Sequence, residues 1–383
     1  MRTAFTELTG AELPIAGFNR SPAVVAAVTR AGGYGVLAAS GYAPAELDAQ
    51  LTWIEEQVGG RPYGIDLLVP EKFADGDPDD LVASLRAQIP AEHLAFIADL
   101  LARYGIPEDD ARLAAGRAGP SADERAAGII PSGALALLDV AFSHRISLIA
   151  SALGTPPPEL VSRGHAAGVA VAALVGQPRH AVRQIEAGVD LLIAQGTEAG
   201  GHTGTIATMV LTPEIVDIAG GRPVLAAGGI ASGRQMAAAL ALGAAGVWCG
   251  SVWLASEEDV ANQAIKDKFL AAASSDTVRS RARTGKPARQ LRSAWHDEWD
   301  RPGSPAPLPL PLQPMLVNDA WRRIDRAAQA GHAGALALES FFVGQVVGSF
   351  REIRPAGEIT RQMAADCERQ IAILAGLLPA TAS

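Results

Sequence analysis

Short runs of consecutive apolar residues alternate with stretches of helical periodicity through the first 250 residues of the chain. Runs that are apolar throughout and too short for a helix predict strands buried on both faces of a parallel sheet. Several of the helical stretches end in glycine, as in TRAGG and IEAG, which is typical of a helix C-terminus. Strands are predicted at 14–18, 35–39, 63–69, 146–150, 169–175, 190–194, 223–227 and 246–250.

Helices are predicted between these strands, at 22–31, 44–57, 133–143, 157–167, 178–187, 212–219 and 232–242. An alternation of eight strands with helices predicts an α/β fold of the closed (β/α)8 type, the TIM barrel. An open, doubly wound sheet is the structural alternative. No G-x-G-x-x-G pattern follows the first strand, which weakens a dinucleotide-binding interpretation.

Two segments depart from the alternation. Residues 71–131 are polar, helical in pattern and too long for an ordinary connection, so they predict an inserted helical segment after the third strand. Residues 256–345 include the stretch GSPAPLPLPLQP, whose prolines exclude one continuous helix. We expect a barrel domain from 1–255 and 346–383 that carries the insertion, a helical cap at 256–345, and a last helix that packs back on the barrel.

The amino-acid composition argues against several classes of function. The formal net charge of −9 over 383 residues argues against nucleic acid as a partner, because phosphate recognition needs clustered Lys and Arg. The two cysteines, Cys249 and Cys367, lie far apart and imply neither a disulfide framework nor a zinc site, so no metal is expected. No charged leader or run of 18 apolar residues occurs, which favours a cytoplasmic protein without a membrane span.

Glycine and serine follow the last two predicted strands. GGIASG comes after the seventh strand and GS after the eighth, where a barrel of this type holds phosphate groups. Gly228, Gly229 and Gly250 have no Cβ, so their N–H groups can approach an anion closely, and Ser251 adds a hydroxyl donor. Each glycine could instead serve only a tight turn.

The stretch QGTEAGGHTG follows the sixth strand and contains His202. An imidazole titrates near neutral pH and can remove a proton from a carbon acid, although a single histidine can also be structural. Gly200 and Gly201 would let a flat ring or a substrate lie against the backbone. Gln195 could form hydrogen bonds with a heterocycle, and Glu198 could orient a neighbouring group or belong to a turn.

Two blocks of the chain carry a resemblance to a known family. AQGTEAGGHTG, followed by PVLAAGGIASGRQMAAALALGAAGVWCGS, closely resembles the signature of nitronate monooxygenases, formerly called 2-nitropropane dioxygenases. The stretch TGKPARQLRSAW and the layout of LPIAGFNRSPAVVAAVTRAGGYGVLAA extend the similarity to about two thirds of the chain. The resemblance implies a soluble TIM-barrel flavoprotein, an oxidoreductase that takes an alkyl nitronate with O2 to a carbonyl compound and nitrite.

The resemblance also implies roles for particular residues. FMN would be the cofactor, its phosphate would lie on the glycines and serine that follow the last two strands, and Gln195 and Gly196 would lie near the isoalloxazine. His202 matches the family's catalytic base. Three positions depart from the family pattern: Asp66 stands where Asn is usual, Leu174 lies roughly where a lysine is expected, and Val252 replaces a common Arg.

Other interpretations stay open. A flavin-dependent enoyl-thioester reductase, or a related acyl-CoA or acyl-carrier-protein enzyme, would share the barrel and the phosphate loops. A sugar-phosphate barrel without flavin and a non-catalytic flavin-binding protein are further alternatives. The expected partners are a small anionic or acyl-thioester substrate and O2, with a homodimer left open.

Cations in the predicted cap allow two interpretations. They could meet an anionic substrate at the mouth of the cavity, or form a solvated helix face with weak ion pairs, which is the interpretation we favour from sequence. The residues concerned are Arg281, Arg283, Lys286, Arg289 and Arg292.

Overall fold

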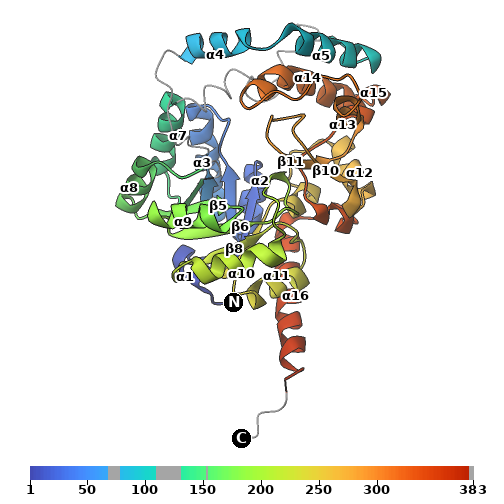
Figure 1. The fold of residues 1–383 in the computed structure, drawn as a ribbon. Helices are drawn as coiled ribbons and strands as arrows, with labels where there is room; N and C mark the ends of the chain where they lie inside the picture. The colour runs from blue at the N-terminus through green and yellow to red at the C-terminus, as the bar shows by residue number, and fades with distance from the viewer. Residues whose placement is uncertain (68–77, 109–130, 152–153, 379–383) are drawn as a thin grey trace, which may run out of the picture.

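Eight parallel strands close into one barrel, which confirms the predicted fold (Figure 1). The computed structural model describes residues 1–67, 78–108, 131–151 and 154–378. Each strand pairs with the next around the barrel, and the last strand pairs back with the first. The strands are β1 (Ile15–Asn19), β2 (Tyr34–Ala38), β3 (Gly64–Asp66), β4 (Leu148–Ser151), β5 (Ala170–Val175), β6 (Leu191–Gln195), β8 (Val224–Ala227) and β9 (Gly246–Cys249).

Helices cover the outside of the barrel near the predicted positions. They are α2 (Pro22–Arg30), α3 (Pro44–Val58), α7 (Pro131–Ser143), α8 (Pro158–Ala166), α9 (Pro178–Glu186), α10 (Thr208–Ile218) and α11 (Gly233–Ala241). The last helix, α16 (Ala356–Ala375), packs against α11 and α2, as expected. A Cβ at Gly233 would lie 2.3 Å from the backbone nitrogen of Cys367, so this close helix contact requires glycine.

The two ends of the barrel differ. At the end where the strands begin, α1 (Ala4–Thr9) inserts the side chain of Phe5. The rings of Phe5 and Tyr34 pack edge to face with their centres 5.7 Å apart, and both side chains are fully buried. Apolar side chains from the strands fill the interior above this plug. At the opposite end, where the strands finish, the cap covers the barrel (Figure 1).

The cap contains helices, as predicted, together with strands that the apolar pattern did not reveal. A three-stranded antiparallel sheet joins two cap strands to β7 (Gly201–His202) in the order β10–β11–β7. The sheet therefore ties the cap to the loop that follows β6. The cap elements are α12 (Gln263–Ala271), β10 (Thr277–Ser280), β11 (Ala288–Leu291), α13 (Ala294–Trp299), α14 (Leu312–Gln329) and α15 (Ala333–Leu338), with short 3-10 helices η1 (Ser251–Ala255), η2 (Ser274–Asp276) and η3 (Gln345–Ser349) nearby.

Two helices of the inserted segment lie beside the cap. α4 (Pro78–Ala87) and α5 (Ala91–Arg103) run above α14 in Figure 1, and α5 shares an apolar core with Trp295, Trp299 and Trp321. Positions 71–77 and 109–130 of the predicted insertion lie outside the described residues. We propose the division into barrel and cap expected from sequence, with α5 packed on the cap.

No helix in the part of the chain that the structure describes combines the length and the apolar character needed to cross a bilayer.

Candidate functional site

A cavity of about 430 Å³ lies between the carboxyl ends of the barrel strands and the cap. Asp66 ends β3, Gln195 ends β6, Gly228 follows β8 and Cys249 ends β9, so several strands deliver residues to one place. The active sites of barrels of this type lie at this end. Nine of the ten residues expected at the site line the cavity: Asp66, Gln195, Gly200, Gly201, His202, Gly228, Gly229, Gly250 and Ser251.

Gly196 is the expected site residue that does not line the cavity. A Cβ at this position would lie 2.1 Å from the hydroxyl oxygen of Thr208 and 2.4 Å from its backbone nitrogen. Gly196 therefore lets the start of α10 pack tightly against the end of β6. Its structural role is clear from these contacts, whereas a contact with the isoalloxazine stays a prediction.

Backbone N–H groups gather where β8 and β9 end. Gly228 and Gly229 have φ angles of +94° and +72°, which favour glycine. Within the described residues, no acceptor is bonded to the N–H of Gly229 or Ser251. The hydroxyl oxygen of Ser251 accepts a hydrogen bond from the N–H of Gly344 at 2.8 Å, which leaves its own hydrogen for a ligand. These donors fit an anionic group such as the phosphate of FMN.

Glu198 has a structural role in the loop after β6. Its carboxylate accepts hydrogen bonds from the N–H of Thr208 at 3.1 and 3.0 Å and from the hydroxyl of Thr208 at 3.0 Å. A carboxylate at the first turn of a helix satisfies unpaired N–H groups and interacts favourably with the helix dipole. This contact explains why α10 begins at Thr208 rather than at the predicted position 212.

His202 lies on β7, where the cap sheet holds it. Its backbone is paired with Ala288 of β11, and its Nε2 lies 2.8 Å from the hydroxyl oxygen of Thr284. The Thr284 hydroxyl in turn donates to the carbonyl of Lys286 at 3.0 Å. Because that bond uses the hydroxyl hydrogen, the threonine oxygen accepts from Nε2–H, and the tautomer assigned in this way leaves Nδ1 as the basic nitrogen.

The surroundings of His202 keep its imidazole neutral. Burial within the cavity lowers its pKa, and the positive charge of Lys286 lowers the pKa further. His202 is nevertheless exposed where it lines the cavity, so a substrate can reach it. A neutral imidazole near neutral pH can accept a proton, which is the property a general base needs.

Two buried groups complete the barrel side of the cavity. Asp66 is 5% exposed, and burial raises the pKa of its carboxyl to about 7. A protonated Asp carries a hydrogen-bond donor, as the Asn usual in the resembled family does. Burial also raises the pKa of the Cys249 thiol to about 12, which makes this cysteine a poor nucleophile.

Leu174 of β5 lines the cavity, so the fifth strand presents an apolar side chain there, as the sequence predicts. Arg20, which directly follows β1, is the one Lys or Arg among the described residues that line it. The sequence interpretation missed both Arg20 and Thr284. Arg20 lies in the stretch LPIAGFNRSP and Thr284 opens TGKPARQLRSAW, but only the fold brings each of them to the site.

The favoured interpretation of the cap cations as a solvated helix face is wrong for two of them. Arg289 lies on β11, is 8% exposed, and donates from Nε to the carbonyl of Thr197 at 2.8 Å, so it fixes the loop after β6. Arg283 packs over the ring of Trp321, with Cζ 4.1 Å from the ring centre. Arg292 does form an exposed ion pair, with Asp297 at 2.7 Å.

Comparison with known proteins gives a consistent picture. The family model described as nitronate monooxygenase matches residues 12–366. A protein named putative monooxygenase Rv1533 from Mycobacterium tuberculosis (strain ATCC 25618 / H37Rv) is 55% identical over 99% of this chain and 100% of its own length. A crystal structure of a nitroalkane oxidase from Streptomyces ansochromogenes is 28% identical, with a TM-score of 0.76 over 97% of this chain and 100% of that one.

A third relative has a different name. The (3aS,4S,5R,7aS)-5-hydroxy-7a-methyl-1-oxo-octahydro-1H-indene-4-carboxyl-CoA dehydrogenase of Rhodococcus jostii (strain RHA1) is 29% identical over 98% of this chain and 99% of its own length. Similarity across nearly the whole length therefore extends to proteins named for different substrates. The family-model match covers both the barrel and the cap, and with it the cavity between them. The chain is an enzyme that belongs to the nitronate monooxygenase family.

Proposed function

We propose that the protein is an FMN-dependent oxidoreductase that oxidises an alkyl nitronate with O2 to a carbonyl compound and nitrite. The observation that carries the proposal is the shared cavity, in which a neutral His202 and the unpaired N–H groups of Gly229 and Ser251 line the same space. When bound, FMN supplies the capacity to accept electrons from the substrate and react with O2. The protein supplies binding, orientation and a base.

The residues around the cavity fit an FMN molecule. The unpaired N–H groups of Gly229 and Ser251, after β8 and β9, would hold the phosphate. Gln195 and the flat backbone of Gly200 and Gly201 would lie along the isoalloxazine. A protonated Asp66 would donate a hydrogen bond to an acceptor on the ring, without placing a full negative charge beside it.

His202 would remove the proton from the carbon next to a nitro group when the substrate arrives as a neutral nitroalkane. Thr284 holds the ring through Nε2, so Nδ1 would be the nitrogen that takes the proton. Thr284 acts here as a positioning residue, since it orients the base without touching the substrate carbon.

A second candidate function is oxidation or reduction of an acyl thioester. It is favoured by the whole-length similarity to a protein named as a carboxyl-CoA dehydrogenase. The same base and the same phosphate cradle would serve it, because removal of a proton next to a thioester carbonyl is also carbon-acid chemistry.

Anaerobic reduction of the flavin-loaded protein tests the proposal. Bleaching of the flavin absorbance by propionate-3-nitronate in the absence of pyridine nucleotide, followed by nitrite release when O2 is admitted, is the expected result. Rapid bleaching by NADH or NADPH, with no response to the nitronate, would instead support a reductase of acyl thioesters.

The assembly state and the cellular location stay predictions. We expect a cytoplasmic protein, with a homodimer left open as its assembly. Light scattering coupled to size-exclusion chromatography measures the mass of the full chain in solution and so decides between a monomer of 39.5 kDa and a dimer.

A further inference from the structure

The C-terminal part of α16 projects away from both the barrel and the cap (Figure 1). Residues 371–378, with the sequence IAILAGLL, form this projection, which we call the α16 tip. Its helical path continues past Ala375, because the N–H of Leu378 donates to the Ala375 carbonyl at 3.2 Å. Every residue of the tip is exposed. The tip is therefore a free helix end and not part of the layer that covers the barrel.

The exposed surface of the tip is apolar. Five large side chains are between 41% and 75% exposed, and the eight residues include no charged or hydrogen-bonding side chain. A helix segment that is apolar on all sides is normally buried, because exposure to water costs the hydrophobic free energy of each side chain. Clustered exposed apolar residues of this kind mark an interaction surface. The five are Ile371, Ile373, Leu374, Leu377 and Leu378.

A stripe with coiled-coil spacing runs from the body of α16 into the tip. Its buried positions in the body follow one another at steps of four and three residues, the spacing of a helix that packs along another helix. In the body, the stripe packs against α11 and α2. The same steps continue through three exposed positions of the tip, which have no partner among the described residues. The stripe consists of Thr360, Ala364, Cys367, Ile371, Leu374 and Leu378.

Gly233 fixes the point where α16 leaves the barrel. A Cβ at Gly233 would lie 2.3 Å from the backbone nitrogen of Cys367, so α11 and α16 are in backbone contact there. Cys367 is fully buried, whereas Ile371, one turn further along the same stripe, is 41% exposed. Because the contact holds α16 firmly, its last eight residues project as a rod about 12 Å long.

The charges near the tip favour a protein partner over a lipid surface. The tip contains no Lys or Arg, and the nearest cation along the chain, Arg369, forms an ion pair with Asp366. Helices that lie on anionic membranes carry Lys or Arg on a polar face. The formal net charge of −9 also opposes the approach of the whole chain to an anionic surface.

An uncharged apolar stripe is complementary to itself. A two-fold axis beside Leu374, the middle exposed position, would bring the stripes of two copies together and bury no charge in either. If the two tips pack antiparallel, the two bodies lie at opposite ends of the paired helices. Their like charges then stay apart, so the net charge that opposes a membrane does not oppose this pairing.

We propose that the α16 tip is a dimerisation surface, through which two copies of the chain pack antiparallel along Ile371, Leu374 and Leu378. The inference goes beyond the proposed function, because the tip lies outside the cavity and its pairing depends on neither flavin nor substrate. Two eight-residue helix ends cover less area than a standard interface of about 800 Å² per partner. The dimer is therefore reversible, with a dissociation constant on the order of micromolar.

Sedimentation equilibrium of the full-length protein, over concentrations around the micromolar range, tests this assignment. We expect the parent to shift from a monomer of 39.5 kDa to a dimer as its concentration rises. Leu374→Ser should raise the dissociation constant by roughly 10- to 100-fold, because it places a hydroxyl at the centre of the apolar contact. Thermal unfolding of the dilute monomer should change little, since the side chain is already partly exposed.

Ile373→Ser is the matched control. Ile373 is 60% exposed, against 42% for Leu374, and lies about 100° around the helix from it, away from the stripe. Its replacement removes at least as much exposed apolar surface, so it measures non-specific adhesion, and the dissociation constant should stay within about twofold of the parent. A monomeric parent, equal weakening by the two variants, or no weakening by Leu374→Ser would overturn the assignment.

Disulfide formation gives a second, geometric readout. Cys249 and Cys367 are both buried, so they contribute little background under mild oxidation. Leu374→Cys should form a covalent dimer on a non-reducing gel, because the two-fold axis brings the two thiols together, and Ile373→Cys should not. The reverse pattern would contradict the proposed register. A protein that stays monomeric and floats with phosphatidylglycerol vesicles, with flotation lost in Leu374→Ser, would replace the second copy by a lipid surface.

Discussion

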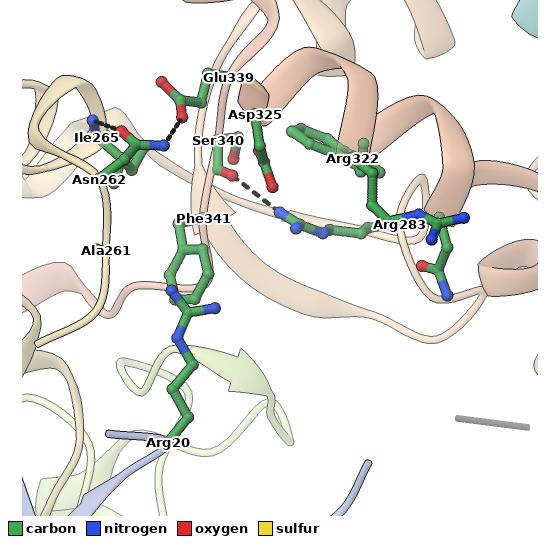
Figure 2. Close-up of a pocket in the computed structure, with 12 residues that line it drawn as sticks. Arg20, Ala261, Asn262, Ile265, Arg283, Arg322, Asp325, Glu339, Ser340 and Phe341 are labelled. Atoms are coloured by element: carbon green, nitrogen blue, oxygen red, sulfur yellow. Dashed lines mark hydrogen bonds between the residues drawn. The ribbon is translucent and has the colours of Figure 1, made fainter. Parts of the chain in front are cut away.

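Two walls of the same cavity are built from different parts of the chain. The barrel wall, where β8 and β9 end, presents backbone N–H groups at Gly229 and Ser251. The cap wall presents the side chains of His202 and Thr284, which the cap sheet positions, and Arg20, which follows β1, reaches this wall from the barrel side and stacks on Phe341 (Figure 2). The first wall suits a constant feature of a ligand, such as a phosphate, and the second suits the group that reacts or varies.

The comparison separates cofactor binding from substrate choice. A backbone cradle changes little when neighbouring side chains change, because it depends on φ angles and on the absence of a Cβ. A wall of side chains can change its charge with one substitution. The nitroalkane oxidase and the carboxyl-CoA dehydrogenase that this chain resembles are named for different substrates.

The largest effect is expected on the cap wall, at the base. His202→Asn removes the proton acceptor and keeps a polar side chain, so kcat/KM for a neutral nitroalkane should fall on the order of 10²- to 10⁴-fold. The affinity for FMN should change little, because the phosphate donors lie on the other wall. Steady-state nitrite release measures kcat/KM, and a flavin titration measures the affinity for FMN. Equal losses in kcat/KM and in FMN affinity would contradict the proposed separation of the two walls.

The second effect concerns the free energy of unfolding of the protein, which depends on Asp66 on the barrel wall. The Asp66 carboxyl has a pKa of about 7 in the folded protein, against an ordinary value of 3.8, so the unfolded chain loses this proton at a lower pH than the folded chain. Stability without flavin should therefore fall as pH rises from about 4 to about 7, by on the order of 3 kcal/mol between pH 5 and pH 8.

Asp66→Asn removes this titration and keeps the size of the side chain. Urea unfolding of the flavin-free protein at several pH values should show a flatter dependence of the free energy of unfolding on pH than in the parent. Parallel curves for the two proteins would mean that the Asp66 carboxyl is not held protonated by burial.

The third effect is on cofactor affinity. Gly228→Val puts a Cβ 2.9 Å from the backbone nitrogen of Ala199 at a φ of +94°, and should weaken FMN binding by roughly 100-fold through strain and displacement of the cradle. Gly221→Ala is the control, since Gly221 has a φ of +84° and no atom within 4 Å of an added Cβ. It should cost stability and leave FMN affinity unchanged.

The smallest effect is expected at the residue that orients the base. Thr284→Ala removes the partner of Nε2, so we expect kcat to fall by roughly tenfold, with a shift in the pH profile and little change in KM. Thr284→Ser keeps the hydroxyl and should restore most of the activity. A loss that serine does not restore would assign Thr284 a packing role.

The barrel and the glycines at the ends of its last strands could be predicted from sequence because their signals are local. Buried parallel strands appear as continuous apolar runs, and a glycine pair after a strand marks a place where the backbone approaches a ligand. Nine of the ten expected site residues line the cavity, most of them found from such local signals and Asp66 through the family resemblance. Gly196 was the exception, because a glycine that admits a neighbouring helix has the same sequence signal as one that admits a ligand.

The cap wall could not be predicted in the same way. β7 has two residues, and β10 and β11 contain polar and charged residues on both faces, so neither apolar alternation nor a continuous apolar run identifies them. Arg20 and Phe341 meet through tertiary packing of distant segments. Their contact depends on how the cap packs over the barrel, and a short stretch of sequence carries no information about that packing.

A comparison of FMN with riboflavin tests the central claim, which is that backbone N–H groups after β8 and β9 hold the phosphate of a flavin. The two molecules share the isoalloxazine and differ in the phosphate, and quenching of flavin fluorescence measures the affinity of each for the flavin-free protein. We expect FMN to bind at least roughly 100-fold more tightly, because two charge-assisted hydrogen bonds are lost with riboflavin. Equal affinities, or binding of neither flavin, would contradict the account.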